Sequence, residues 1–360
     1  MDITEIWIDR KDFRKTKIVT GQSESLADGD VLVRIDKFAL TSNNVGYALS
    51  GDFIGYWGYY PTGEDGWGKL TVWGIAEVVE SRSPEIKVGE RLYGFFPMAS
   101  HVVLKAGNIS DAGFTDVAAH RKDLPDLYNQ YQRTAGGPAY LLALEDERCL
   151  LFPLFMTAFV LADYLNDNQY FDAQQILIGS VSSKTGFALA HFLANDPAFE
   201  GKVIGLTSPS NAGFVERLGN CDQVVVYGQE EASIANAPSV FVDMSGDGPL
   251  KKKLHEFLTD DMQKSVSVGG THWDAERVTD ELPGSQPEFF FTPAHIAKRD
   301  ADWGAGVLFE RANQAGADLG EIVKKDIDVE VIKGAEAAQQ IWLDMLDNKV
   351  TANRGIMVSI

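Results

Sequence analysis

Small residues interrupt an apolar run between positions 175 and 190, and this pattern predicts a strand, a tight turn and a helix. The small positions after the strand are Ser180, Ser183 and Gly186. A turn of this form can hold a pyrophosphate, because backbone N–H groups at the helix start point at the ligand and the helix dipole favours negative charge. Only one of the usual glycines is present, so an ordinary strand-to-helix turn is the alternative, and the neighbouring segments must decide.

Five further β-rich runs follow this turn, with helical stretches between several of them. The first of them, 202–207, is apolar and leads into a helical stretch at 214–218. The others lie at 223–227, 239–243, 265–269 and 289–292. Strands that alternate with helices in this way predict an α/β fold with a doubly wound parallel sheet.

The end of the second strand indicates which dinucleotide the turn would hold. An Asp or Glu about 20 residues beyond the turn normally binds the ribose 2′-hydroxyl of NAD and would repel a 2′-phosphate. The segment 207–211 has no acid and offers three hydrogen-bond donors: Ser208, Ser210 and Asn211. A phosphate also needs a charge-assisted partner, and we favour Lys184 over Arg217 for that role. The pattern therefore predicts NADP, with two solvated surface cations as the alternative interpretation.

Composition restricts the class of protein. The chain has 360 residues, of which 45% are hydrophobic, enough for two domains with a core each. Its net charge of −20, from 32 basic and 52 acidic residues, disfavours nucleic acid and anionic membranes as partners. No apolar stretch reaches the roughly 18 residues of a membrane span, and the first residues lack signal-peptide features. We therefore expect a cytoplasmic enzyme with a small-molecule substrate.

The N-terminal part of the chain has a different sequence pattern, which is typical of β-strands. Alternating polar and apolar residues predict a strand at 31–39, and further strand signals lie at 72–80, 91–95 and 100–105. We interpret residues 1–150 as a β-rich domain. A Gly-rich and aromatic stretch at 51–74 is too apolar for a linker. Its aromatic residues either pack in the core or line a cleft: Trp57, Tyr59, Tyr60, Trp67 and Trp73.

Taken together, these segments resemble the medium-chain dehydrogenase/reductase superfamily, specifically its zinc-free branch of quinone and enoyl reductases. The resemblance rests on the order of five segments: 30–35, 88–94, 100–104, 152–159 and 353–358. It implies a GroES-like β-barrel domain at 1–150 and 296–360, a Rossmann domain at 151–295, and a homodimer. The region 113–147 is longer than the family usually has, with a helix expected at 126–133, and is a lid, a dimer contact or a surface loop.

The family's zinc-containing members hold the metal through Cys and His residues in the barrel domain. The matching stretches here, 41–44 and 72–77, contain neither residue type. The 6 histidines show no close ligand spacing, and the two cysteines, Cys149 and Cys221, are too few for a four-cysteine zinc site. We therefore expect a zinc-independent enzyme without a metal site.

The resemblance also assigns site residues. It places Tyr47 beside the nicotinamide, with Asn43 and Asn44 as possible amide donors to a carbonyl, although Asn43 replaces the family's proline and Val45 its acid. The alternative is that Tyr47 packs under a barrel turn and the asparagines form Asx turns. Cofactor contacts carried over from the family are Thr157, Ser180, Ser182, Ser183, Lys184, Thr185, Gly186, Ser208, Tyr227, Gly269 and Gly270, with His272 as a weaker substrate contact. Asn211 is added to them as a donor to the 2′-phosphate.

Three functional classes follow from this sequence. The favoured one is an NADPH-dependent reductase that transfers hydride to an activated double bond or a quinone-type carbonyl, with Tyr47 stabilising the developing oxyanion. A second is a zinc-free oxidoreductase of an alcohol, a carbonyl or an enoyl thioester. The third is a noncatalytic NADPH-binding protein, since the same branch includes lens crystallins.

Overall fold

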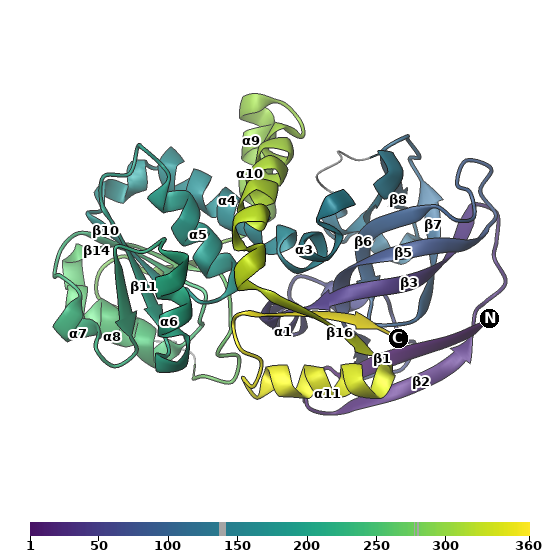
Figure 1. Cartoon of the computed structure of the whole chain (residues 1–360), viewed down its shortest axis with the longest axis horizontal. Coiled ribbons are helices and arrows are strands. Elements are labelled where there is room, and N and C mark those ends of the chain that lie inside the picture. Colours follow the sequence, from purple (N-terminus) through teal and green to yellow (C-terminus); the bar gives the residue numbers. More distant parts are fainter. Residues whose placement is uncertain (137–141, 277, 279–280) are drawn as a thin grey trace. The chain divides into compact units, whose positions relative to one another are not determined.

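The computed structural model describes residues 1–136, 142–276, 278 and 281–360. The chain forms two compact units (Figure 1). Unit one comprises Met1–Leu150, Ile327–Val350 and Arg354–Ile360, and unit two comprises Leu151–Asp326 and Thr351–Asn353. Unit one is built on a β-barrel and unit two on a parallel sheet, so the predicted α/β class is confirmed.

A closed antiparallel barrel forms the centre of unit one. Its strands pair in the order β3-β5-β6-β9-β8-β7, and β7 pairs back onto β3, so no barrel edge is left open. The barrel strands are β3 (Asp30–Leu40), β5 (Thr71–Ser81), β6 (Arg91–Pro97), β7 (His101–Gly107), β8 (Gly113–Asp116) and β9 (Gln130–Arg133). The strands expected at 31–39, 72–80, 91–95 and 100–105 are therefore confirmed.

Shorter elements extend the barrel. The C-terminal strand β17 (Arg354–Ser359) lies antiparallel to β3 and parallel to β16 (Asp328–Lys333). A separate antiparallel sheet contains β1 (Asp2–Asp9), β2 (Thr16–Gln22) and β4 (Trp67–Lys69). The remaining elements are helical: α1 (Ser42–Leu49), η1 (Tyr56–Gly58), η2 (Ala119–Arg121), η3 (Asp126–Asn129), η4 (Thr134–Gly136), α3 (Glu145–Leu150) and α11 (Ala335–Leu346).

The region 113–147 contributes strands β8 and β9 to the barrel, and helix α3 begins at Glu145 near its end. The prediction of a helix at 126–133 is wrong, because a short 3₁₀ turn ends at Asn129 and strand β9 follows. In that strand only Tyr131 is buried while its neighbours point outward, which is the period of a strand. Asp116 and Arg121, each with a side chain only 2% exposed, form an ion pair 3.2 Å long that fastens the segment to the interior. Positions 137–141 lie outside the described residues.

Unit two contains a six-stranded parallel sheet. Its order is β12-β11-β10-β13-β14-β15, so the chain starts in the middle, runs to one edge, and returns to fill the other. The strands are β10 (Gln175–Gly179), β11 (Lys202–Thr207), β12 (Gln223–Val226), β13 (Ser239–Asp243), β14 (Met262–Ser267) and β15 (Pro287–Phe289). This is the expected doubly wound sheet, with the topological switch point between β10 and β13.

The helices of unit two are α4 (Phe152–Asp167), α5 (Lys184–Ala194), α6 (Pro209–Leu218), α7 (Glu230–Ser233), α8 (Gly248–Leu258), α9 (Thr292–Trp303) and α10 (Val307–Val323), with 3₁₀ turns η5 (Gln169–Asp172), η6 (Thr259–Asp261) and η7 (Lys324–Asp326). None of the helices in the described part of the chain is long and apolar enough to cross a membrane.

The boundary expected at residue 296 differs from the structural one, since residues 296–326 belong to unit two. Helix α9 is fastened to α4 by a buried polar contact: Asp163 Oδ2 lies 2.6 Å from both His295 Nε2 and Arg299 Nε. Helix α10 packs on α4 at Gly316, where an added Cβ would lie 3.7 Å from the Cβ of Phe155. These contacts explain why both helices remain with the parallel sheet.

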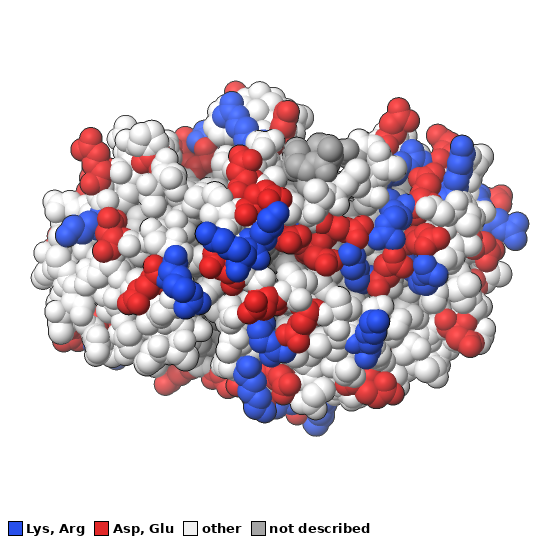
Figure 2. All heavy atoms as spheres, in the orientation of Figure 1, with Lys and Arg blue, Asp and Glu red and all other residues white. Residues whose placement is uncertain are grey.

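Charged side chains are mixed on the surface. Figure 2 shows Lys and Arg side chains next to Asp and Glu on the face in view, without a gathered basic patch there. In unit one, Lys37 Nζ lies 2.5 Å from Glu145 and 2.7 Å from Asp146, and Arg91 lies 2.8 Å from Glu145. These ion pairs fasten α3 to the barrel strands β3 and β6.

Four consecutive residues without a glycine adopt the left-handed conformation between α4 and β10. The φ angles are 52° for Gln169, 52° for Tyr170, 55° for Phe171 and 55° for Asp172. Such a conformation costs about 1–2 kcal/mol per residue, because Cβ comes too close to the following carbonyl oxygen. The Tyr170 hydroxyl donates to Asp196 Oδ2 over 2.5 Å, and its ring packs 4.8 Å from Phe199, which helps hold the turn.

Gln169→Gly should therefore stabilise the protein by about 0.5–1 kcal/mol, because Gln169 is exposed and glycine removes the steric penalty at its positive φ. Urea unfolding of this variant beside Gln169→Ala measures the effect. Alanine keeps a Cβ and should leave the stability nearly unchanged. A glycine variant less stable than the alanine variant would contradict the left-handed turn.

Candidate functional site

The turn between β10 and α5 lies at the switch point of the sheet. Strand β10 ends at Gly179, and Ser180 reverses the chain with φ of 53°. Ser183 is the N-cap of α5, and its Oγ accepts the backbone N–H of Gly186 over 3.1 Å. The predicted strand, turn and helix are thus confirmed, and the helix begins at Lys184.

Gly186 is required by the space around it. A Cβ at this position would lie 2.7 Å from the backbone oxygen of Ser180 and 2.8 Å from Cα of Val181. Both atoms belong to the backbone of the turn, so neither can move without moving the turn. The first turn of α5 is therefore pressed against the chain that leaves β10, as in turns that present N–H groups to a pyrophosphate.

Side chains tie the turn to the neighbouring strands at their carboxyl ends. Ser182 Oγ accepts a hydrogen bond from Thr207 at the end of β11, over 3.1 Å. The backbone N–H of Ser180 donates to the hydroxyl of Tyr227, which follows β12, over 2.9 Å. Thr271, beyond β14, donates to Ser180 Oγ over 3.0 Å. These hydrogen bonds bring together Ser180, Ser182 and Tyr227 at the carboxyl ends of the parallel strands. Thr271 is an addition that the sequence did not single out.

The residues proposed for a 2′-phosphate begin α5 and α6. Lys184 is the first residue of α5, and its Nζ donates to Ala352 O over 3.4 Å, while burial lowers the pKa of Lys184 to about 8. Ser208 is the N-cap of α6, and its Oγ lies 2.9 Å from Ser210 Oγ. Arg217 donates to Gly213 O on its own helix over 3.0 Å, so its guanidinium is engaged away from the helix start.

This pKa predicts how cofactor affinity depends on pH. Below about pH 8 the ammonium of Lys184 is charged and attracts a phosphate, and above it the ligand-free protein loses that charge. The affinity for NADPH should therefore fall by up to about tenfold per pH unit above pH 8.

Lys184→Met should lower the affinity for NADPH about tenfold at pH 7, since a charge-assisted hydrogen bond contributes about 1.5–3 kcal/mol. Titrations from pH 7 to pH 9 measure both effects.

NADH is the control for this prediction, because it lacks the 2′-phosphate. An equal loss of NADH and NADPH affinity in Lys184→Met would place Lys184 at the pyrophosphate instead. Unchanged affinity for both nucleotides in Lys184→Met would show that Lys184 is not part of the nucleotide site.

The remaining predicted cofactor residues have varied surroundings. Gly269 lies against the loop after β13, where an added Cβ would be 2.8 Å from Met244 O, and Gly270 follows it. His272 Nδ1 lies 3.2 Å from Asp247 Oδ2. The hydroxyl of Thr157 donates to Pro153 O within α4 over 3.2 Å, while Thr185 and Asn211 lie in the first turns of α5 and α6.

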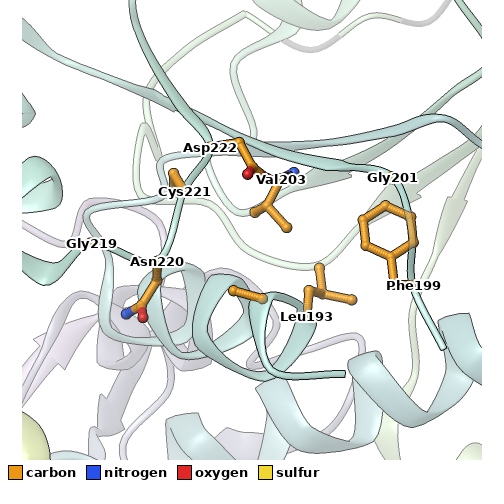
Figure 3. A pocket seen from close by; sticks show the side chains of 9 residues that line it. Leu193, Phe199, Gly201, Val203, Gly219, Asn220, Cys221 and Asp222 are labelled. Atoms are coloured by element: carbon orange, nitrogen blue, oxygen red, sulfur yellow. Dashed lines mark hydrogen bonds between the residues drawn. The ribbon is translucent and has the colours of Figure 1, made fainter. Parts of the chain in front are cut away.

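A separate pocket lies at the other end of the strands, where the parallel strands begin (Figure 3). It is lined by the end of α5, the chain entering β11, and the loop between α6 and β12. Phe199 lies on one side of it, and Asn220 and Cys221 on the other. The amino ends of the parallel strands lie on this side of the sheet, whereas the turn after β10 lies at their carboxyl ends. The pocket is therefore not part of that turn. Burial raises the pKa of the Cys221 thiol to about 12, which leaves that thiol protonated.

In unit one, the predicted catalytic residues lie on helix α1. Asn44 Oδ1 accepts the backbone N–H of the N-cap residue Thr41 over 2.7 Å, and Asn44 Nδ2 donates to Thr71 O over 2.9 Å. Both polar groups of this side chain therefore hold the start of the helix in place. Asn43 is half-buried and Tyr47 is buried one turn further along the helix.

The hydroxyl of Tyr47 accepts a hydrogen bond from Trp73 Nε1 over 3.1 Å. An indole N–H is only a donor, so the Tyr47 proton points elsewhere. Burial raises the pKa of Tyr47 far above its usual value, with a further increase from Tyr128, whereas hydrogen bonding by Trp73 and Asn43 lowers it. Tyr47 is therefore a neutral phenol that keeps a proton to donate.

Aromatic side chains surround this hydroxyl. The Tyr47 ring centroid lies 4.7 Å from that of Tyr56, 5.2 Å from that of Phe95 and 6.4 Å from that of Tyr128. We call Tyr47, Tyr56, Trp73, Phe95 and Tyr128 the aromatic wall. The sequence analysis singles out Tyr47 and Trp73 of this wall, but not the hydrogen bond between them or the contribution of Tyr128.

Acidic, histidine and cysteine side chains do not gather into a metal site in the described ranges: no group of three or more is placed to hold an ion. The aromatic wall contains only uncharged residues, and its polar atoms are hydroxyls and one indole N–H. The arrangement can donate hydrogen bonds to an oxygen that gains negative charge.

Comparison with known proteins gives one family and a shared fold. The model of the family described as "Protein of unknown function (DUF2855)" matches residues 38–351. No curated protein matches the sequence. The structure is similar to that of CurA from Vibrio vulnificus in complex with NADPH, with 13% identity, a TM-score of 0.61, and coverage of 99% of this chain and 98% of that one.

Two further solved structures have the same fold. The yhdH oxidoreductase from Salmonella enterica in complex with NADP has 14% identity and a TM-score of 0.52, and the match covers 100% of each chain. The mitochondrial 2-enoyl thioester reductase Etr1p/Etr2p heterodimer from Candida tropicalis has 11% identity and a TM-score of 0.58, again over 100% of each chain. The resemblance to medium-chain dehydrogenases/reductases is thereby confirmed at the level of the fold.

Proposed function

We propose that this chain, which belongs to the DUF2855 family, is an NADPH-dependent oxidoreductase that transfers hydride to an activated double bond or a quinone-type carbonyl. The observation that carries the proposal is the turn after β10. At Gly186 there is no space for a side chain, and α5 begins at the switch point of the sheet. Similar proteins with the same fold were solved with NADPH or NADP bound, which supports this cofactor.

The residues around the turn fit NADP. Backbone N–H groups at the start of α5 would hold the pyrophosphate, and Lys184 with Ser208 and Asn211 would hold the 2′-phosphate. The absence of an acid from 207–211 leaves nothing there to repel that phosphate. Tyr227 would lie at the adenosine end, and Thr157, Gly269 and Gly270 near the nicotinamide.

Bound NADPH would supply the hydride, and the protein's own residues would deal with the charge that results. Hydride addition to the β-carbon of a conjugated ketone leaves the electron pair of the double bond on the carbonyl oxygen as an enolate. The Tyr47 hydroxyl, oriented by Trp73 and assisted by Asn43, would donate its hydrogen bond to that oxygen. A proton from water then completes the saturated ketone. Asn44 would act through the fold, by holding the start of α1.

Isotope transfer tests this proposal. The protein is incubated with a conjugated ketone and with NADPH that carries deuterium in both hydrogen positions of the nicotinamide C4, and the product is examined by mass spectrometry. One deuterium per product molecule is the expected result. NADPH binding without NADPH oxidation by any enone, quinone or carbonyl would instead support the noncatalytic role.

A further inference from the structure

We propose that Tyr128 determines substrate specificity, and that its hydroxyl pair with Tyr56 binds a second, uncharged acceptor oxygen of the substrate. This inference rests on the proposed function, in which Tyr47 binds the first oxygen. It gives a role to the segment between β8 and β9, for which the sequence allows a lid, a dimer contact or a surface loop.

The position of Tyr128 supports this role. The residue belongs to the 3₁₀ turn η3, yet its ring lies among rings from α1, η1 and the barrel strands. Its centroid lies 4.7 Å from Phe95, 5.3 Å from Tyr56 and 6.1 Å from Trp73. The side chain therefore completes the wall that contains Tyr47.

The hydroxyl pair keeps one proton for a ligand. Tyr56 and Tyr128 place their hydroxyl oxygens 2.9 Å apart, and either can be the donor. Each phenol has one proton, so one proton serves the mutual bond and the other remains. Within the described residues, neither hydroxyl makes a further hydrogen bond. Burial raises the pKa of both tyrosines above the usual value, so both stay neutral and the spare proton is retained.

The chemistry of the wall selects the ligand. Aromatic faces favour a flat, conjugated molecule. Two separate hydroxyl donors, Tyr47 and the pair, suit a molecule with two acceptor oxygens. No residue of the wall carries a charge, so a second carbonyl fits this wall better than a carboxylate or a phosphate.

Isophorone and ketoisophorone provide the test, because both contain a conjugated ketone on a six-membered ring and ketoisophorone has an additional carbonyl. NADPH oxidation is followed with the wild type, Tyr128→Phe and Tyr56→Phe. Tyr128→Phe should lower kcat/KM for ketoisophorone about tenfold, mainly through KM, and change it less than about twofold for isophorone. Tyr56→Phe should act in the same direction.

Tyr93→Phe is the matched control. Tyr93 stacks on Trp73 at 5.4 Å, and among the described residues its hydroxyl makes only a long contact of 3.4 Å, to Arg148 O and outside the pair. This variant should treat both ketones as the wild type does, and thermal unfolding checks that all variants fold.

Equal losses with both ketones in Tyr128→Phe would show a structural role, and no loss with either would also overturn the proposal. The wild-type arm tests the proposed function separately. If the wild type reduces neither ketone, the proposed function is rejected for conjugated ketones, and the role of Tyr128 in it is rejected as well.

Discussion

Tyr47→Phe should lower kcat by about 100- to 1000-fold while the dissociation constant for NADPH changes less than about twofold, because loss of one oxyanion donor typically costs a factor of this size. The variant keeps the ring and its contacts but removes the one proton that Trp73 leaves available. Single-turnover NADPH oxidation with a conjugated ketone measures the chemical step, and fluorescence measures NADPH binding.

The control for this variant is again Tyr93→Phe, which removes another buried hydroxyl next to Trp73. Tyr47→Phe also leaves the indole N–H of Trp73 without its acceptor, so we expect a loss of stability of about 1–2 kcal/mol. Rates are therefore compared below the unfolding transition. An unchanged chemical step in Tyr47→Phe would remove Tyr47 from the mechanism and favour its interpretation as a packing residue.

Gly186→Ala should weaken NADPH binding about 10- to 100-fold, because displacing the N–H groups at the start of α5 loses a hydrogen bond to the charged pyrophosphate, which contributes about 1.5–3 kcal/mol. The added Cβ would meet the backbone oxygen of Ser180 at 2.7 Å, so the first turn of α5 has to move away from the strand end. We also expect a loss of stability of about 1–3 kcal/mol from overpacking. Titration with NADPH and thermal unfolding measure the two effects.

Gly213→Ala is the matched control for the glycine. Gly213 lies in α6 of the same unit, and an added Cβ there would come no closer than 3.9 Å to Arg217 Nη1. That variant should bind NADPH as the wild type does and be slightly more stable, since alanine favours the helix. Equal NADPH affinity of Gly186→Ala and the wild type would show that the turn after β10 does not hold the cofactor.

The parallel sheet was largely predictable from the sequence, because buried strands are short apolar runs bounded by turn residues. The strands at 202–207 and 239–243 have the expected bounds. The expected run 265–269 begins later than β14, because the polar residues Gln263 and Lys264 follow Met262 at the start of that strand. The expected run 289–292 overlaps β15 only at Phe289, because that strand begins at Pro287 and helix α9 begins at Thr292.

Other features depend on contacts that local patterns do not contain. Strand β9 is only four residues long and is fixed by pairing with β6 and β8, so the local pattern at 126–133 predicts a helix that the structure does not contain. Residues 296–326 join unit two through Asp163 and Phe155, far away in the sequence. For the same reason, the sequence predicted Tyr47 but neither its hydrogen bond from Trp73 nor the proximity of Tyr128.

A fluorescence titration of the purified protein with NADPH and, separately, with NADH tests the central claim most directly. We expect saturable NADPH binding and at least about tenfold weaker NADH binding, since charge-assisted contacts to the 2′-phosphate contribute about 1.5–3 kcal/mol. Binding of neither nucleotide would contradict the account, because the turn after β10 would then be an ordinary strand-to-helix turn closed by Ser180 and Ser183.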